Sequence, residues 1–216
     1  MWGVAPIHDL TRAAKYEVLG QPLKLSMSDL NLWKPGERVK PLVVPDDMRT
    51  ESLYLGDFGQ AMKLGCERTQ EGRPPLRYCS PDQLHHRSPS FACDMWSYMC
   101  IFAQLYIGLT PFPTWGKGGV IASMVGTLGP LPEQWKGSYL WVEESQDMWY
   151  NLNTKPWSES LEKKIDRMRP DCDPVEKKHA LSVLTRGFSY YPEKRPSATQ
   201  LLRDASFRAI MDNYGC

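Results

Sequence analysis

The residues of this chain whose types and order could bind a metal ion are Asp57, Phe58 and Gly59. They follow residues 52–55, where apolar side chains alternate and predict a short strand. A carboxylate at a strand end can bind Mg²⁺, the phenylalanine can anchor the turn in an apolar core, and the glycine can act as a flexible joint. The same tripeptide also suits an ordinary turn that ends a strand, so these three residues alone leave both interpretations open.

Such a site must be held in place by the rest of the fold. We expect residues 92–109 to form the central helix of that fold. Only three of these side chains are plainly polar, and the apolar ones fall on every face at the helical period. Ser90 can cap the start of the helix and Gly108 can end it. We therefore expect a helix that is buried on all sides. A membrane span is the alternative, but Asp94 in the first turns and the lack of a basic flank disfavour it.

The remaining patterns predict a mainly helical chain. Strong start signals are Asp173 followed by Pro174, and the capping box formed by Ser197 and Gln200. Two short strands are expected to pair as a small β-hairpin, and two segments are expected to be irregular. The helices are expected at residues 11–19, 120–128, 174–187 and 198–211, the strands at 38–44 and 52–55, an exposed irregular segment at 60–82, and a second one at 131–156.

Composition limits the partners and the compartment. The chain has 216 residues, 42% of them hydrophobic, so we expect a packed globule. Lys and Arg number 26 against 25 acids, which disfavours nucleic acid and anionic membranes as partners. The six cysteines include no CxxC pair, and residues 1–10 lack the pattern of a secretory signal. We therefore expect reduced thiols and an intracellular, cytoplasmic or nuclear, location.

Other polar clusters are interpreted as ordinary surface. The histidines lack zinc spacing, and His85 and His86 beside Arg87 are expected on a solvated helix end. The charged stretch at residues 162–169 is expected to be a solvated face, with docking of an acidic partner as the alternative.

Four motifs in a fixed order resemble the C-terminal lobe of the eukaryotic-type protein kinases. They are LYLGDFGQA at residues 53–61, RYCSPDQL at 77–84, the helix that opens ACDMWSYMC at 92, and PEKRPSATQLL at 192–202. MVGTLGPLPEQW at 124–135 is similar to the insert in the branch that holds SR-protein, cyclin-dependent and mitogen-activated kinases. The resemblance implies a mainly α fold with a small β-hairpin, in which residues 51–216 form the kinase-like C-terminal lobe and residues 1–50 an irregular segment.

The resemblance also implies roles for single residues. Asp57, with Phe58 and Gly59, would form the cofactor-binding motif, and Asp57 would bind Mg²⁺. Asp82 stands where the family has a glutamate that pairs with a buried arginine. In this chain Asp82 would pair with Arg195 in the interior. Asp94 would accept backbone hydrogen bonds that hold the catalytic loop, although a solvated acid at a helix start explains its position equally well.

A further resemblance places a catalytic-loop remnant at residues 7–14. IHDLTRAA is similar to the HxDLxxxN motif with one residue lost, which would make Asp9 the catalytic base; a chance match explains the short motif nearly as well. Ala14 stands where the second metal ligand belongs, and Pro75 replaces a threonine that Ser/Thr kinases usually carry. Thr69 is a candidate phosphosite by its place between the two motifs.

Two parts of the kinase machinery have no counterpart in these residues. Only 56 residues precede Asp57, and they contain neither a Gly-rich loop nor a strand lysine. The glycine-rich run at residues 115–119 comes after the motif at residues 57–59, whereas the Gly-rich loop of a kinase comes before it. The resemblance implies ATP and Mg²⁺ as cofactors and transfer of a phosphoryl group to Ser or Thr of a protein. We expect these 216 residues alone to be nearly inert. A pseudokinase or protein-binding scaffold, with exposed tryptophans between residues 115 and 157 as its interface, is the alternative, and an incomplete reading of the gene is a third.

Overall fold

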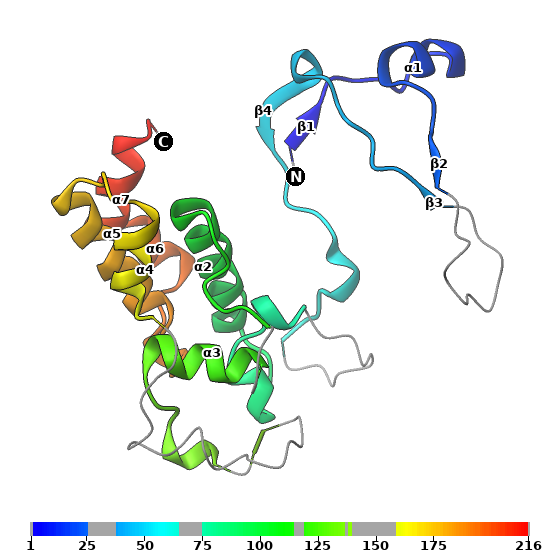
Figure 1. Cartoon of the computed structure of the whole chain (residues 1–216). Coiled ribbons are helices and arrows are strands. Elements are labelled where there is room, and N and C mark those ends of the chain that lie inside the picture. Colours follow the sequence, from blue (N-terminus) through cyan, green and yellow to red (C-terminus); the bar gives the residue numbers. More distant parts are fainter. Residues whose placement is uncertain are drawn as a thin grey trace. The chain divides into compact units, whose positions relative to one another are not determined.

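The computed structural model describes residues 2–25, 38–64, 75–114, 119–136, 138–139 and 159–215. The chain divides into two compact units, Met1–Gly59 and Gln60–Cys216, which are described separately. The strands that Figure 1 labels, β1 to β4, belong to the first unit, and the longer helices belong to the second. Among the described residues, every buried apolar side chain of the core lies between Cys79 and Ile210, so the packed interior seen there belongs to the second unit. The mainly helical character expected from the sequence is confirmed.

The first unit contains two small antiparallel sheets. Strand β1 (Trp2–Val4) pairs with β4 (Arg49–Leu53), and β2 (Lys24–Leu25) pairs with β3 (Arg38–Val39). The helix α1 (Arg12–Leu19) begins after Thr11, whose side chain accepts a hydrogen bond from the Ala14 amide.

The strand pairing corrects the expected hairpin. Residues 38–44 and 52–55 do not pair with each other in this unit. The third strand ends at Val39, two residues before Pro41, which has no N–H to donate and restricts the residue before it. The fourth strand instead pairs with the N-terminal strand, where a side chain at Gly3 would place its Cβ 2.2 Å from Thr50 Oγ1. The pairing of β1 with β4 therefore requires glycine at position 3.

Helix α2 (Phe91–Ile107) is the centre of the second unit, but only one side of it is buried. It begins after Ser90 and ends at Gly108, whose φ of 81° is left-handed. Its buried side packs against α5 (Pro174–Gly187) and α4 (Leu161–Met168). The expected burial on all sides is wrong, because apolar side chains on the other side are exposed: Phe91 by 72%, Tyr98 by 41%, Ile101 by 49% and Leu105 by 81%. Apolar composition predicted burial, but the positions of the neighbouring helices decide which side is covered.

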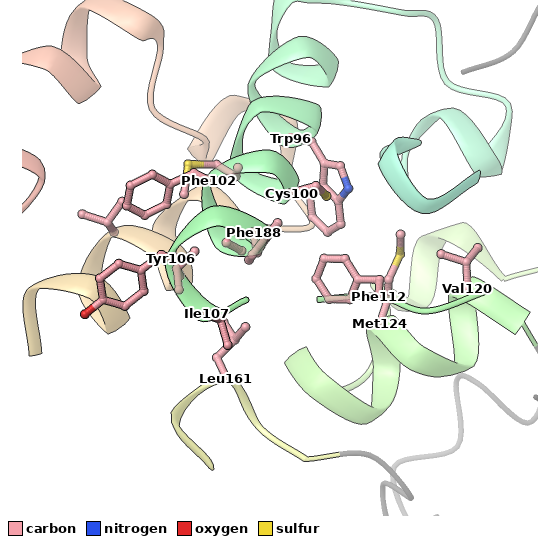
Figure 2. Packing of buried hydrophobic residues seen from close by; sticks show 14 of the residues in the cluster. Trp96, Cys100, Phe102, Tyr106, Ile107, Phe112, Val120, Met124, Leu161 and Phe188 are labelled. Carbon is pink, nitrogen blue, oxygen red and sulfur yellow. The ribbon is translucent and has the colours of Figure 1, made fainter. Parts of the chain in front are cut away.

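Aromatic rings fill the space around this helix. Trp96 stacks on Phe112 with ring centroids 5.3 Å apart, and Phe188 meets Phe112 edge to face at 4.8 Å. Figure 2 shows this cluster, with Phe102 and Tyr106 on one flank of α2 and Phe112 on the other. Offset and edge-to-face pairs of this kind stabilise beyond their buried area, by about 0.5 to 1.5 kcal/mol each.

Caps set the boundaries of the later helices. The Asp173 side chain accepts hydrogen bonds from the amides of Val175 and Glu176, which confirms the predicted start of α5. The single helix expected at residues 198–211 is instead two, α6 (Ala198–Leu202) and α7 (Ala205–Asn213). Asp204 interrupts it because its carboxylate accepts the amides of Ser206 and Phe207 and thereby begins a new helix.

The remaining helix of the described residues, α3 (Gly119–Leu128), agrees with the expected range of 120–128. Residues 131–136 contain one short 3₁₀ turn, Glu133–Trp135. No helix within the described ranges is long and apolar enough to cross a membrane.

Candidate functional site

Asp57, the carboxylate proposed to bind Mg²⁺, lies on the surface of the first unit. Asp57 follows β4 and has a φ of 64°, a left-handed conformation that aspartate tolerates better than most residues. Its side chain is exposed, and Phe58, which begins a short 3₁₀ turn, is 65% exposed. Gly59 has room for a side chain, since a Cβ there would lie 3.7 Å from Asp57 Oδ1. Within its unit the motif is therefore an open turn.

The proposed catalytic-loop acid is also exposed. Asp9 lies in the turn before α1, with its side chain 90% exposed and its Oδ2 3.1 Å from His8 Nε2. Ala14 lies in the first turn of the following helix. A methyl group has no lone pair to bind a cation, so this position supplies no second metal ligand.

These donors fall short of a site for Mg²⁺ and ATP. The described residues contain no group of three or more His, Cys, Asp or Glu that could hold a metal ion. Mg²⁺ is usually held by one or two carboxylates together with the phosphates of the nucleotide, so Asp57 could supply one ligand. The other parts that hold phosphates, a Gly-rich loop and a strand lysine, do not occur in residues 1–56. Asp57 and the other described acids therefore supply at most part of such a site.

In the second unit, the structure brings Asp82 and Arg195 together as a buried ion pair. Asp82 Oδ1 contacts Arg195 Nη2, and the two residues are 1% and 5% exposed. The pairing expected from the resemblance is thus present. Asp82 and Arg195 are 113 positions apart in sequence, so this contact joins two distant segments.

Arg195 also donates to three backbone carbonyls. Its Nε donates to Ser189 O at 2.8 Å, Nη1 to Ala92 O at 3.0 Å, and Nη2 to Tyr190 O at 3.1 Å. Its guanidinium carbon lies 5.0 Å from the centre of the Trp96 ring. A buried ion pair is tolerated only when its remaining donors and acceptors are satisfied, and here Arg195 binds the start of α2 and residues 189–190 as well as the acid.

The second oxygen of Asp82 has a partner that the sequence did not reveal. Cys93 Sγ donates to Asp82 Oδ2 at 3.2 Å. Burial raises the pKa of the Cys93 thiol, and the negative charge of Asp82 adds to this rise, so the group remains a donor at neutral pH. A small thiol on the first turn of α2 therefore helps to position the aspartate.

Asp94 lies on the exposed side of α2, and no hydrogen bond or ion pair joins its side chain to other described residues. Residues 79–82 are buried, which corrects the expected exposed segment at its C-terminal end. Thr69 lies outside the described residues.

Two buried groups were expected on the solvated surface, and both expectations are wrong. His85 is 1% exposed, and Lys164 is 5% exposed. Lys164 Nζ donates to Pro111 O at 2.8 Å and to Thr127 Oγ1 at 2.7 Å, and burial lowers the pKa of this lysine to about 8. A sequence signal for Lys164 existed, since it lies three residues after Leu161 on the same face of α4. No comparable pattern marks His85.

A second polar cluster ties α2 to α5 and to the chain end. Glu176 Oε1 accepts hydrogen bonds from Tyr106 at 2.8 Å and Tyr214 at 3.1 Å, and Arg169 Nη1 lies 3.1 Å away. Burial raises the pKa of Glu176, but the two tyrosine donors and the arginine charge outweigh it and hold this pKa below its ordinary value. The cluster is therefore built around a charged carboxylate.

The tryptophans expected to form an interface are only partly within the described residues. Trp135 is 4% exposed and packs in the core, so it cannot be part of an exposed interface. The others, Trp115, Trp141, Trp149 and Trp157, lie outside the described residues.

Comparisons with known proteins show similarity to protein kinases. The family model for the protein kinase domain matches residues 42–207. Dual specificity protein kinase CLK1 of Homo sapiens is 26% identical over 142 residues, which cover 57% of this chain and 28% of that protein. Mitogen-activated protein kinase 17 of Arabidopsis thaliana is 31% identical over 127 residues, covering 55% and 22%. The chain thus spans less than a third of the length of these relatives.

Proposed function

The chain belongs to the protein kinase domain family, and from that premise we propose that residues 51–216 act as the helical lobe of a protein kinase-like domain. In such a domain this lobe holds the protein whose Ser or Thr receives the γ-phosphoryl group of ATP. The observation that carries the proposal is the buried contact of Asp82 with Arg195, which joins the segment after the DFG-like motif to α2 and to the PEKRP segment. In the family, these are the segments that support the substrate side.

We infer that residues 1–216 by themselves transfer phosphoryl groups very slowly. Phosphoryl transfer is catalysed by positioning and by electrostatic stabilisation, so losing the groups that hold the phosphates removes most of the effect. Asp57 and Asp9 are both exposed carboxylates, and Ala14 offers no ligand. The chain therefore contributes an arrangement of helices and at most part of a metal site.

The test is a radiometric assay with purified residues 1–216, Mg²⁺, labelled ATP and a mixed protein substrate such as casein. We expect incorporation no higher than in the matched variant Asp57→Asn, which removes the one proposed metal ligand with little change in size. Strong incorporation that Asp57→Asn abolishes would overturn the inference of inertness. Incorporation that persists in the variant would point to a contaminating kinase.

A second candidate function is a pseudokinase or scaffold that binds proteins without nucleotide chemistry. The observation that favours it is the poor donor set, with Ala14 in place of a ligand and two exposed acids. A thermal melt with and without Mg²⁺ and ATP separates the candidates, because a ligand stabilises the state it binds by RT ln(1 + [L]/Kd). A shift that Asp57→Asn removes supports retained nucleotide binding, and no shift at saturating nucleotide supports the scaffold.

An intracellular location is part of the same proposal. The described cysteines, Cys79, Cys93, Cys100 and Cys172, form no disulfide. Thiols that are not joined in disulfides are usual in reducing compartments. Fractionation of cells that express a tagged chain would test this location, and recovery from the medium would contradict it.

A further inference from the structure

His85 occupies an enclosed position between two segments of the second unit. Its ring centroid lies 5.1 Å from that of Trp135 and 5.5 Å from that of Tyr139. Its Nδ1 lies 2.6 Å from Pro81 O, and since a carbonyl oxygen can only accept, Nδ1 carries the proton. The ring therefore binds its own segment by a hydrogen bond, and it contacts Trp135 and Tyr139 through their aromatic rings.

The segment that carries His85 also carries the ion pair. The amide of His85 donates to Asp82 O at 3.0 Å. Across the contact, the Trp135 ring meets the Tyr190 ring edge to face at 6.4 Å, and Tyr190 O accepts from Arg195. The imidazole thus lies where three segments meet, at residues 79–87, 133–136 and 188–195.

The charged groups around His85 act in opposing directions. Burial is the largest influence and lowers the pKa of His85, and the charges of His86 and Arg87 lower it further. The hydrogen bond to Pro81 and the charge of Asp82 raise it. From the opposite segment the facing groups are the rings of Trp135 and Tyr139, while the nearby Lys136 and Glu133 pair with each other. The rings can favour a cation, yet the net effect disfavours the charged form.

We propose that His85 is a pH-sensitive latch, which holds residues 79–87 against Trp135 and Tyr139 while it is neutral and releases them when it is protonated. The latch concerns the closing of this segment and does not rest on phosphoryl transfer or on nucleotide binding. Because the pKa is lowered in the closed state, the open state binds more protons between that lowered value and the ordinary 6.5. The closed state therefore loses stability as the pH falls through this window, and the loss levels off below it.

Amide hydrogen exchange of residues 79–87, corrected for the intrinsic effect of pH, tests the latch in the full chain. One linked proton raises the opening equilibrium by up to about tenfold per pH unit below about pH 6.5. The variant His85→Asn keeps a side-chain donor for Pro81 O without titrating, so its protection should stay nearly constant over the same window. The control His86→Asn removes the exposed neighbouring histidine, and its protection should depend on pH as in the wild type. His86 has a φ of 58°, which asparagine tolerates.

Equal loss of protection in the wild type and in His85→Asn would overturn the proposal, as would a loss that His86→Asn removes. If His85→Asn does not fold, the titration of the His85 ring by NMR in the wild type decides instead. A midpoint below 6.5 together with increasing exchange supports the latch, and a midpoint at or above 6.5 overturns it.

Discussion

Removing the guanidinium of Arg195 should destabilise the second unit strongly. Asp82 is 1% exposed, and the substitution Arg195→Ala removes its cation. It also leaves the carbonyls of Ala92, Ser189 and Tyr190 without this donor. Breaking a buried pair by deleting one partner typically costs about 3 to 5 kcal/mol, because the surviving charge stays desolvated. The Cys93 thiol can still donate to Asp82, but one weak donor does not replace the cation.

The assay is urea unfolding followed by tryptophan fluorescence, to which Trp96, 5.0 Å from the guanidinium, should contribute. In a thermal melt, a loss of about 3 to 5 kcal/mol would lower the melting temperature of a domain of this size by about 6 to 20 °C. The matched control is Arg186→Ala, since Arg186 also pairs with an aspartate, Asp204, but its side chain is 47% exposed. A surface pair of this kind contributes at most about 1 kcal/mol.

The double variant Asp82→Asn with Arg195→Ala refines the reasoning. If the cost comes from an uncompensated charge, neutralising Asp82 should restore part of the stability lost in Arg195→Ala. A loss below about 1 kcal/mol in Arg195→Ala, or a loss no larger than that of Arg186→Ala, would refute the argument that the pair anchors the fold.

Three further predictions follow from contacts in the second unit. Gly187→Ala should lower the free energy of unfolding by about 1 to 3 kcal/mol, because the new Cβ would lie 2.5 Å from Cγ of the buried Met99; urea unfolding showing no loss would contradict this close approach of α5 to α2. The wild type should gain stability relative to Lys164→Met as the pH rises from about 8 to 10.5, because in this range Lys164 is protonated in the unfolded chain and neutral in the folded chain. A difference between the two melts that does not change with pH would show that Lys164 titrates normally. Asp204→Ala should cost about 1 kcal/mol through loss of the cap of α7, measured by thermal unfolding, and Asp204→Asn should recover most of it.

Several features of the fold could be predicted because their causes are local. Thr11, Asp173 and Ser197 each accept the hydrogen bonds of a helix start, and these caps act within three or four residues. The contact of Asp82 with Arg195 is not local. It was expected only because the order of motifs resembles the protein kinase family, whose fold brings these segments together.

Other features failed because they depend on which segments become neighbours. An apolar pattern on α2 cannot tell which side will meet α4 and α5, so Leu105 was expected in the core and is 81% exposed. A short strand such as β4 offers the same backbone groups to any partner, so its pairing with β1 was not evident. For Asp57, the sequence offered a motif, and the structure adds its open, left-handed turn.

The sequence by itself determined the family, the helices with strong caps and the charge balance, since these depend on residue types and on spacing along the chain. The tertiary structure alone decided that Lys164 and His85 are buried, that Cys93 donates to Asp82, and which side of α2 is covered. Burial and pKa depend on what surrounds a side chain in space, and residues far apart in the chain supply those surroundings.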